Sequence, residues 1–128
     1  MILADTDVLI DYLLGIQPAA RQLRAYAESD RLRTSAVNCF ELLSGADRSK
    51  RGDDVRRLIA STPVLPLDLE SAAHAARVRR DLAAEGLPIG MGDSLIAGIA
   101  LANGLPLLTR NRRHFGKVEG LDLVPVDQ

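Results

Sequence analysis

Apolar residues in this chain occur in short runs that alternate with stretches of helical spacing. The first run, Ile2–Ala4, ends at a polar Asp-Thr-Asp segment, after which apolar residues return at positions 8, 9, 12 and 13. A short apolar run is typical of a buried strand, and recurrence every three or four residues is typical of an amphipathic helix. The chain therefore begins with a strand that leads into a helix, and a strand apolar on both faces belongs in the middle of a helix-covered sheet.

The same alternation continues along the chain. Further strands are predicted at residues 31–35, 64–67, 105–109 and 121–126, and further helices at 18–29, 36–45, within 46–61, at 68–84 and at 93–104. Pro66 favours an edge position for the third strand, because proline cannot donate to a neighbour. The inward face of the helix at 68–84 is predicted to carry Ala72, Ala76, Val78 and Leu82. Strands alternating with helices through short loops predict an α/β fold, a three-layer α/β/α sandwich with a mainly parallel central sheet.

Composition sets limits on the class of protein. The 128 residues fit a single domain over 1–128, and 47% hydrophobic with only 3% aromatic residues predicts an aliphatic core. A net charge of −1 excludes a wholly basic nucleic-acid coat, so basic contacts must be local. Cys39 is the only cysteine, which excludes an internal disulfide and favours a small buried side chain. With no leader pattern and no long apolar run, we expect a soluble cytoplasmic protein and no membrane contact.

Familiar catalytic motifs of other classes are absent from the sequence. There is no GxGxxG or Walker A pattern, and no serine or cysteine stands beside a histidine. His74 is expected at the surface or the rim of the core. His114 is expected in a packing or surface role, since the adjacent Phe115 is a candidate core anchor, although His114 could also assist at an RNA-binding surface.

Three carboxylates occupy comparable structural positions. Asp5 ends the first strand, Glu41 lies on the helix after the second strand, and Asp93 opens a strongly apolar helix. Each has a simpler role available: Asp5 and Asp93 can cap a helix N-terminus, and Glu41 can lie on the surface. In a parallel sheet, however, the loops at the carboxyl ends of the strands open onto the same crevice. We therefore expect the three acids to lie close together.

Clustered carboxylates repel one another, and a divalent cation relieves that repulsion. Without compensation at least one of the three would have a raised pKa. Mg²⁺ binds carboxylate and water oxygens in an octahedron and uses one or two protein carboxylates directly. Such an ion polarises a phosphoryl oxygen and lowers the pKa of water. Phosphodiester hydrolysis is the natural reaction of such a site.

Four segments combine these acids with small polar residues: LADTDVLI at 3–10, SAVNCFELLSG at 35–45, GDSLIA at 92–97 and LTRN at 108–111. In this order and spacing they resemble the four motifs of PIN-domain nucleases, specifically the VapC-type toxins of bacterial toxin–antitoxin pairs. The resemblance covers nearly the whole chain. The order of the motifs in a chain of this size makes the combination specific, although each motif alone is weak.

The resemblance implies a fold, an activity and a set of site residues. It implies that Asp5, Glu41 and Asp93 are metal ligands, and that Thr6 and Thr109 orient them by hydrogen bonding. It also implies an endoribonuclease that depends on Mg²⁺ or Mn²⁺ and leaves 3′-hydroxyl and 5′-phosphate ends. The implied partners are an RNA substrate, a VapB-type antitoxin as inhibitor, and a second copy of the chain in a homodimer.

Asn111 is a departure from the family pattern, because many PIN domains have a fourth acid at this position. An amide supplies no negative charge to a metal, so one tightly held ion is favoured, with any second ion brought by the substrate. Asn111 is still expected at the catalytic site, hydrogen-bonded to a metal-bound water or to Asp93. Asp7 lies close to the site and is expected to support or cap it without binding the metal directly.

RNA is negatively charged, so basic side chains are expected around the acidic edge. The first candidates for phosphate contacts follow the fourth strand, and a second group lies in the segment 46–61: Arg110, Arg112 and Arg113, then Arg48, Lys50 and Arg51. Aromatic residues for base stacking are scarce. Recognition is therefore expected to depend on RNA shape and backbone more than on splayed bases.

Two further functions from other classes are consistent with the α/β pattern. A signalling receiver domain would use Asp68, after the third strand, as phosphoacceptor, but it also needs a lysine at the end of the fifth strand that this chain lacks. A non-catalytic RNA-binding or protein-binding module would keep the fold without the chemistry, as Asn111 could indicate.

Overall fold

The computed structural model describes residues 1–46 and 50–127. Within these residues, no helix is both long enough and apolar enough to cross a lipid bilayer. The elements along the chain are β1 (Ile2–Ala4), α1 (Thr6–Leu14), α2 (Ala19–Glu28), β2 (Leu32–Ser35), α3 (Ala36–Ser44), α4 (Lys50–Ser61), β3 (Val64–Leu65), α5 (Leu69–Ala84), α6 (Met91–Ala102), β4 (Leu107–Leu108), α7 (Arg112–Phe115) and β5 (Leu123–Val124). The predicted strands are confirmed, although most are shorter than predicted.

The strands form one parallel sheet with β1 at its centre. Their order is β3-β2-β1-β4-β5, and every pair is parallel. Leu3 is in register with Arg33 on one side and with Leu107 on the other. β3 lies at the edge, as Pro66 predicted. The central position of β1 confirms the prediction made from its apolar faces.

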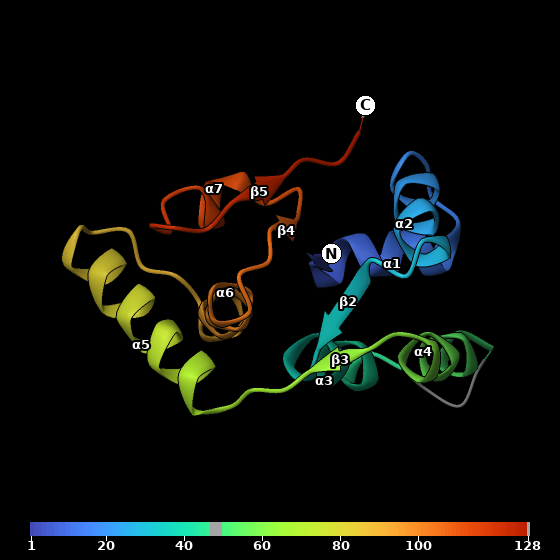
Figure 1. Cartoon of the computed structure of the whole chain (residues 1–128), viewed down its shortest axis with the longest axis horizontal. Helices are drawn as coiled ribbons and strands as arrows, with labels where there is room; N and C mark the ends of the chain where they lie inside the picture. Colours follow the sequence, from blue (N-terminus) through green and yellow to red (C-terminus); the bar gives the residue numbers. More distant parts are fainter. Residues whose placement is uncertain (47–49, 128) are drawn as a thin grey trace.

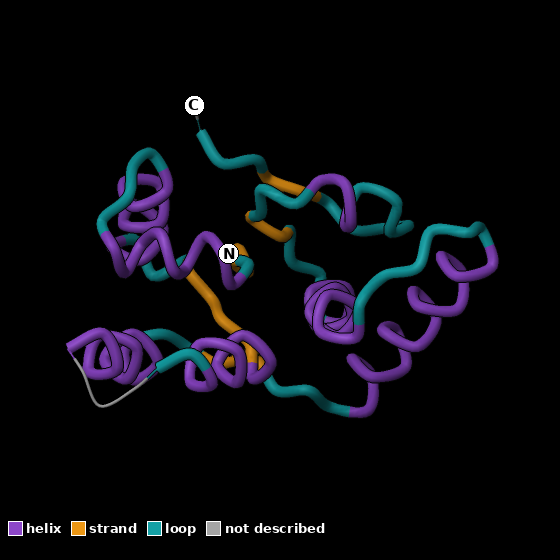
Figure 2. Tube along the Cα trace, turned by 180° about the vertical axis from the view of Figure 1, so that it is seen from behind, coloured by secondary structure: helices purple, strands orange, loops and turns teal. Residues whose placement is uncertain are grey.

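Helices cover both faces of the sheet, and alternate strand residues point to opposite layers. Ile2 and Ala4 pack with residues of α1, α2 and α4, whereas Leu3 packs with residues of α5, α6 and α7. In β4, Leu107 and Leu108 divide between the two layers in the same way. Figures 1 and 2 show the two groups of helices on either side of the strands. The three-layer α/β/α prediction is therefore confirmed.

Two helix starts differ from the prediction. α6 begins at Met91, with Gly90 as its N-cap, so Asp93 is the third helical residue and not the cap. Gly90 can take the extended backbone of an N-cap although it has no capping side chain. A prediction that looks for a polar N-cap residue therefore misses the start of α6. The short helix α7 was not predicted. It begins after Asn111, whose side-chain Oδ1 accepts a hydrogen bond from the His114 backbone N–H at 3.3 Å.

Two single-residue predictions are confirmed in the core. Phe115 is fully buried and anchors the end of α7. Cys39 is also buried, and desolvation raises the pKa of its thiol, as expected for a structural cysteine.

α5 and α6 make the closest helix pair of the structure. The face of α5 toward the core carries Ser71, Ala75, Val78 and Leu82, spaced by three or four residues. Ala76, predicted to face inward, is exposed, because the helical stripe passes through Ala75. Small side chains on this stripe let the two helix backbones come close together.

Gly98 on α6 provides a test of this packing. A Cβ at position 98 would lie 2.7 Å from the Cβ of Ala75 and would also collide with the carbonyl oxygen of Ser71. We expect Gly98→Ala to lower the free energy of unfolding by about 1–3 kcal/mol, despite the higher helix propensity of alanine. Urea denaturation measures the loss. Gly45→Ala is the matched control, since its Cβ would approach no atom closer than 3.8 Å, and equal stability of the two variants would contradict the packing argument.

Candidate active site

Asp5 lies at the carboxyl end of the central strand and is the N-cap of α1. Its Oδ1 accepts a hydrogen bond from the Thr6 backbone N–H at 2.9 Å, and its Oδ2 accepts one from Thr109 Oγ1 at 2.8 Å. The residue is only 6% exposed. Desolvation raises the pKa of Asp5 from 3.8 to about 6, the two hydrogen bonds oppose the rise, and the negative charges of Asp7 and Asp93 add to it. Within residues 1–46 and 50–127, no basic side chain offsets this rise in the pKa of Asp5.

Glu41 is held toward the same edge by a chain of hydrogen bonds. Thr6 Oγ1 donates to Glu41 Oε1 at 2.6 Å, and Asn38 Nδ2 donates to Thr6 Oγ1 at 2.9 Å. Ser35 fixes Asn38 in turn, because its Oγ accepts from the Asn38 backbone N–H at 3.1 Å and donates to Asn38 Oδ1 at 2.5 Å. The other Glu41 oxygen packs against Gly92, where an added Cβ would lie 3.2 Å away. Glu41 therefore bridges from α3 to the start of α6.

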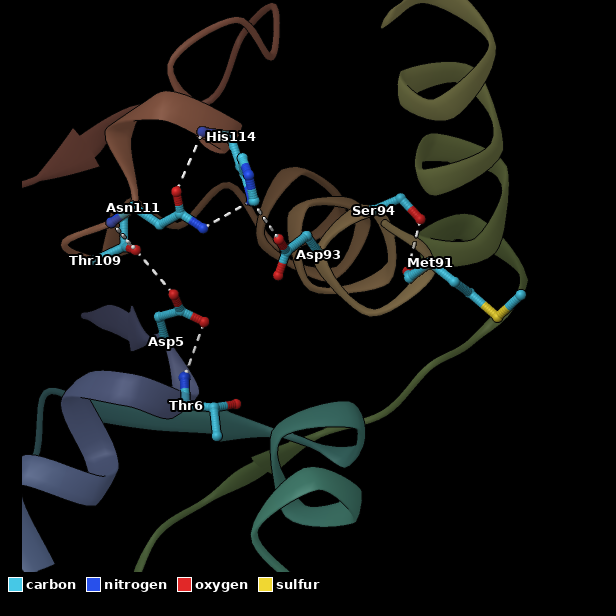
Figure 3. Close-up of polar contacts among 8 residues, drawn as sticks. All are labelled: Asp5, Thr6, Met91, Asp93, Ser94, Thr109, Asn111 and His114. Atoms are coloured by element: carbon cyan, nitrogen blue, oxygen red, sulfur yellow. Dashed lines mark hydrogen bonds and ion pairs between the residues drawn. The ribbon is translucent and has the colours of Figure 1, made fainter. Parts of the chain in front are cut away.

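Asp93 points from the first turn of α6 into the space that Asp5 also faces. Figure 3 shows the two carboxylates on either side of one gap, with His114 above Asp93. His114 Nδ1 lies 3.1 Å from Asp93 Oδ2. A carboxylate in the first turn of a helix is stabilised by the positive end of the helix dipole. The position of Asp93 is thus set by its helix and by one imidazole.

The Asn111 side chain contacts His114. The sequence predicted a hydrogen bond from Asn111 to a metal-bound water or to Asp93, and the contact with a metal-bound water stays a prediction. In the structure, Asn111 Nδ2 lies 2.9 Å from His114 Nδ1 (Figure 3). The reason is that the other amide atom, Oδ1, caps α7. One ring nitrogen cannot accept from the amide and donate to the carboxylate at the same time. Asn111 and Asp93 are therefore alternative hydrogen-bond partners of the same imidazole atom.

The three acids lie at the same edge of the sheet, but their side chains are not preformed as a three-ligand metal site. Within residues 1–46 and 50–127, no three His, Cys, Asp or Glu side chains are close enough to hold one ion. Like charges separate when no cation is between them, and here Glu41 is bonded to Thr6 and Asp93 to His114. Asp5 and Asp93 together still fit Mg²⁺, which binds one or two carboxylates and fills its other positions with water. The all-oxygen donor set and the uncompensated burial of Asp5 both suit a hard divalent cation.

The other predicted residues surround this edge. Asp7 is exposed in the first turn of α1 and acts on Asp5 by charge; the cap is Asp5 itself. Arg110 forms an ion pair with Asp11 of α1. Exposed side chains at this edge or on α4 include Arg112, Arg113, Lys50 and Arg51, whereas Arg48 lies outside the described residues.

Four residues that help to build the site were not predicted in these roles. They are Ser35, Asn38, Gly92 and His114. Ser35 and Asn38 could have been predicted from their spacing, because an asparagine three residues after a capping serine lies within reach of its side chain. The spacing of Asn111 and His114 was a similar signal, because residues three apart meet in the first turn of a helix.

The receiver-domain alternative is wrong. Its phosphoacceptor, Asp68, follows β3, which is the edge strand of the sheet. The Asp68 side chain instead caps α5, and its Oδ1 accepts from the Ser71 backbone N–H at 2.9 Å. This residue therefore lies away from the end of the central strand.

Comparisons with known proteins agree with this geometry. The family model described as "PIN domain" matches residues 2–121. The chain is 37% identical over 121 residues to Ribonuclease VapC10 of Mycobacterium tuberculosis H37Rv, covering 94% of this chain and 90% of that protein. It is 31% identical over 121 residues to the tRNA(fMet)-specific endonuclease VapC of Shigella flexneri, covering 91% of each.

Solved structures show the same fold. The crystal structure of VapBC2 from Rickettsia felis bound to a promoter DNA fragment has a TM-score of 0.86 at 22% identity, covering 99% of this chain and 100% of that one. DNA-bound VapBC from Salmonella typhimurium has a TM-score of 0.81 at 27% identity, covering 98% of both chains. The chain therefore belongs to the PIN domain family and, within it, to the VapC proteins.

Proposed function

We propose that this chain is an endoribonuclease toxin that hydrolyses RNA phosphodiester bonds with Mg²⁺ or Mn²⁺ and is neutralised by a VapB-type antitoxin. The observation that carries the proposal is the buried carboxylate of Asp5, which faces Asp93. In the part of the chain that the structure describes, no basic side chain offsets its charge. The names of the relatives, ribonuclease and tRNA(fMet)-specific endonuclease, support RNA as the substrate.

The roles of the acids follow from their contacts. Asp5 and Asp93 would hold the cation, and Glu41 would complete the acidic edge through water. The chemistry supplied by a bound cation is polarisation of a phosphoryl oxygen and a lowered pKa of water. Thr109 keeps Asp5 Oδ2 in place, and Thr6 does the same for Glu41 Oε1. These hydroxyls orient the carboxylates without neutralising them, so negative charge stays available to the cation.

The exposed basic residues that follow β4 are assigned to the RNA backbone. Arg112 and Arg113 open α7, whose N-cap Asn111 already belongs to the site. Arg110 is tied to Asp11, which fixes the position of its guanidinium group. Guanidinium groups bind phosphates through paired N–H donors. We assign these arginines to positioning the RNA strand, a role that carries no base specificity.

An apolar cavity beside Glu41 is the proposed site of the antitoxin. The cavity measures about 210 Å³ and is lined mostly by apolar residues of α1, α3 and α4, including Ile10, Leu14 and Val55. Ile10 is 39% exposed and Leu14 is 45% exposed. Since Glu41 is part of the same wall, a protein bound here would reach the acidic edge. The VapBC complexes among the similar structures support a partner of this kind.

A homodimer is proposed from a separate group of exposed apolar side chains. These lie on the edge strand β3, in the loop after it and at the starts of α5 and α6: Val64, Leu67, Leu69 and Met91. Leu69 is 86% exposed and Met91 is 62% exposed. An unpaired edge strand flanked by apolar side chains is a surface that a second copy can cover.

Asp93→Asn tests the catalytic role of the acids. The amide cannot supply charge to the cation, so we expect RNA cleavage to fall at least about 100-fold while the fold is kept. Cleavage is measured on total RNA and on a labelled oligonucleotide, with the product ends mapped as 3′-hydroxyl and 5′-phosphate. EDTA should abolish the wild-type activity, and excess Mg²⁺ should restore it.

The control for this experiment is Asp81→Asn, which removes one carboxylate from the exposed side of α5. Its cleavage rate should match that of the wild type. Full activity of Asp93→Asn would contradict the proposed site. RNA binding without any cleavage, equal with and without Mg²⁺, would instead support a non-catalytic module.

The raised pKa of Asp5 predicts a pH-dependent cost in stability. Folded Asp5 keeps its proton up to about pH 6, whereas in the unfolded chain it loses it near 3.8. The contribution of Asp5 to the free energy of unfolding is therefore fully present below the pKa of the unfolded chain. It is lost as the pH rises through about 6. One pH unit corresponds to about 1.4 kcal/mol, so the ionised group costs up to about 3 kcal/mol. In EDTA at pH 7.5, we expect Asp5→Asn to be more stable than the wild type by about 1–3 kcal/mol.

Urea denaturation at pH 4.5 and 7.5 measures this difference. The difference in stability between Asp5→Asn and the wild type should be smaller at pH 4.5, where wild-type Asp5 is largely protonated. It should also be smaller in saturating Mg²⁺, which stabilises only the wild type. Asp81→Asn again serves as the control and should show neither effect. A less stable Asp5→Asn at pH 7.5 in EDTA would contradict the buried, uncompensated charge.

Leu14→Glu tests the antitoxin cavity. Loss of apolar contact and burial of a charge should weaken binding of the cognate VapB-type antitoxin at least about tenfold, with RNA cleavage unchanged. Calorimetry on the purified pair measures the affinity. Leu87→Glu, at a position that is 44% exposed in the loop before α6, is the control. Equal affinities of the two variants would place the antitoxin elsewhere.

A further inference from the structure

We propose that the cavity between the ends of β4 and β5 and the start of α2 binds a single nucleotide of the RNA strand, next to the phosphate that is cut. The inference rests on the proposed function and identifies where the substrate strand continues beyond the acids. The cavity measures about 470 Å³, within the range of about 300–1,000 Å³ that is typical of small-molecule sites.

The cavity shares a wall with the acidic edge. Thr109 lines the cavity and also donates its hydroxyl hydrogen bond to Asp5 Oδ2 at 2.8 Å. Its backbone N–H donates to the Val124 carbonyl oxygen at 3.2 Å, which joins the site to β5. A nucleotide in the cavity would therefore contact the same residue that holds the carboxylate proposed to bind the cation.

Two guanidinium groups, those of Arg110 and Arg112, line the cavity. Arg110 is held in place by its ion pair with Asp11. Arg112 also lines the cavity, and among residues 1–46 and 50–127 it pairs with no carboxylate. An exposed, unpaired arginine at the mouth of a cavity is available to a phosphate group through charge-assisted hydrogen bonds. The anion of the ligand is therefore assigned to Arg112.

The remaining walls distinguish a nucleotide from a simple anion. Pro18, Pro125 and Val126 present apolar surface on which a base or ribose can rest. Asp127 adds a carboxylate to the wall, which repels inorganic phosphate but accepts hydrogen bonds from ribose hydroxyls and base amino groups. A ligand that is anionic at one end, and apolar with hydrogen-bond donors at the other, fits this combination.

The C-terminal wall of the cavity is fixed by one side chain of α2. Gln22 Nε2 donates to the Pro125 carbonyl oxygen at 3.1 Å, and Gln22 Oε1 accepts from the Asp127 backbone N–H at 2.9 Å. Figure 1 shows the segment after β5 running toward α2. Both ends of a single amide are used to hold a segment that follows the last strand. The wall is therefore built before any ligand arrives, which lowers the entropy cost of binding.

The test is binding of mononucleotides to the full chain without a metal. Amide NMR spectra are recorded in EDTA while 5′-AMP, 5′-CMP, 5′-GMP or 5′-UMP is added, with inorganic phosphate and adenosine as separate probes. We expect shifts at Thr109, Val126 and Asp127, and at least about tenfold weaker binding of phosphate than of the best nucleotide. Arg112→Ala should weaken nucleotide binding about tenfold. Arg80→Ala, an exposed change on α5, should leave it unchanged.

Cleavage kinetics give a second readout. Arg112→Ala and Gln22→Ala should raise KM for the oligonucleotide more than they lower kcat, because they alter binding of the strand and not the acids. The proposed nucleotide subsite would be contradicted if the amide chemical-shift changes were confined to the apolar cavity beside Glu41. It would also be contradicted if inorganic phosphate bound as tightly as a nucleotide. Cleavage without nucleotide binding would overturn the subsite and leave the nuclease proposal standing. Nucleotide binding in a chain that cuts no RNA would support the subsite and overturn the nuclease proposal.

Discussion

A carboxylate buried at the end of the central strand is the constraint on which this structure depends. β1 must be apolar to sit in the middle of the sheet, so the residue that ends it is drawn into the protein with it. Burial of an ionised group is costly unless the group is paired or hydrogen-bonded. The described residues supply Asp5 with two hydrogen bonds but no positive charge. The site is therefore stable enough to form and still favourable to a cation.

The hydrogen bonds that support the acids come from neighbouring strand ends of the parallel sheet. Thr109 follows β4, and Ser35 ends β2, where it begins the chain of contacts through Asn38 to Glu41. Parallel pairing places these residues at one edge, although they are far apart in the sequence. None of the supporting contacts is made by an arginine or lysine. Among the described residues, the arginines after β4 lie outside this network, so under the proposed function they would contact RNA while the acids hold a cation.

The sequence predicted those parts of the architecture that depend on local residue type, such as the apolar pattern of a strand or helix and the position of a proline. Alternation of apolar runs and helical spacing predicted the layers, and Pro66 predicted the edge strand. The positions of Asp5, Glu41 and Asp93 relative to the predicted strands and helices predicted that the three acids lie at one edge of the sheet. The sequence could not predict that Glu41 packs against Gly92 or that His114 contacts Asp93, because those contacts depend on how α3, α6 and α7 approach one another. Tertiary distances of this kind are not encoded in local periodicity.

Two cavities of different composition adjoin the acidic edge, one at Glu41 and one at Thr109, and we assign inhibition to the first and substrate binding to the second. The cavity beside Glu41 is mostly apolar, which suits a protein partner, because burial of apolar surface drives such association. The cavity beside Thr109 combines arginines with prolines, which suits a nucleotide. Each cavity shares one wall with the acids. Under the proposed function, a partner bound in the first cavity would block the acids without occupying the second, so an inhibitor would not have to imitate RNA.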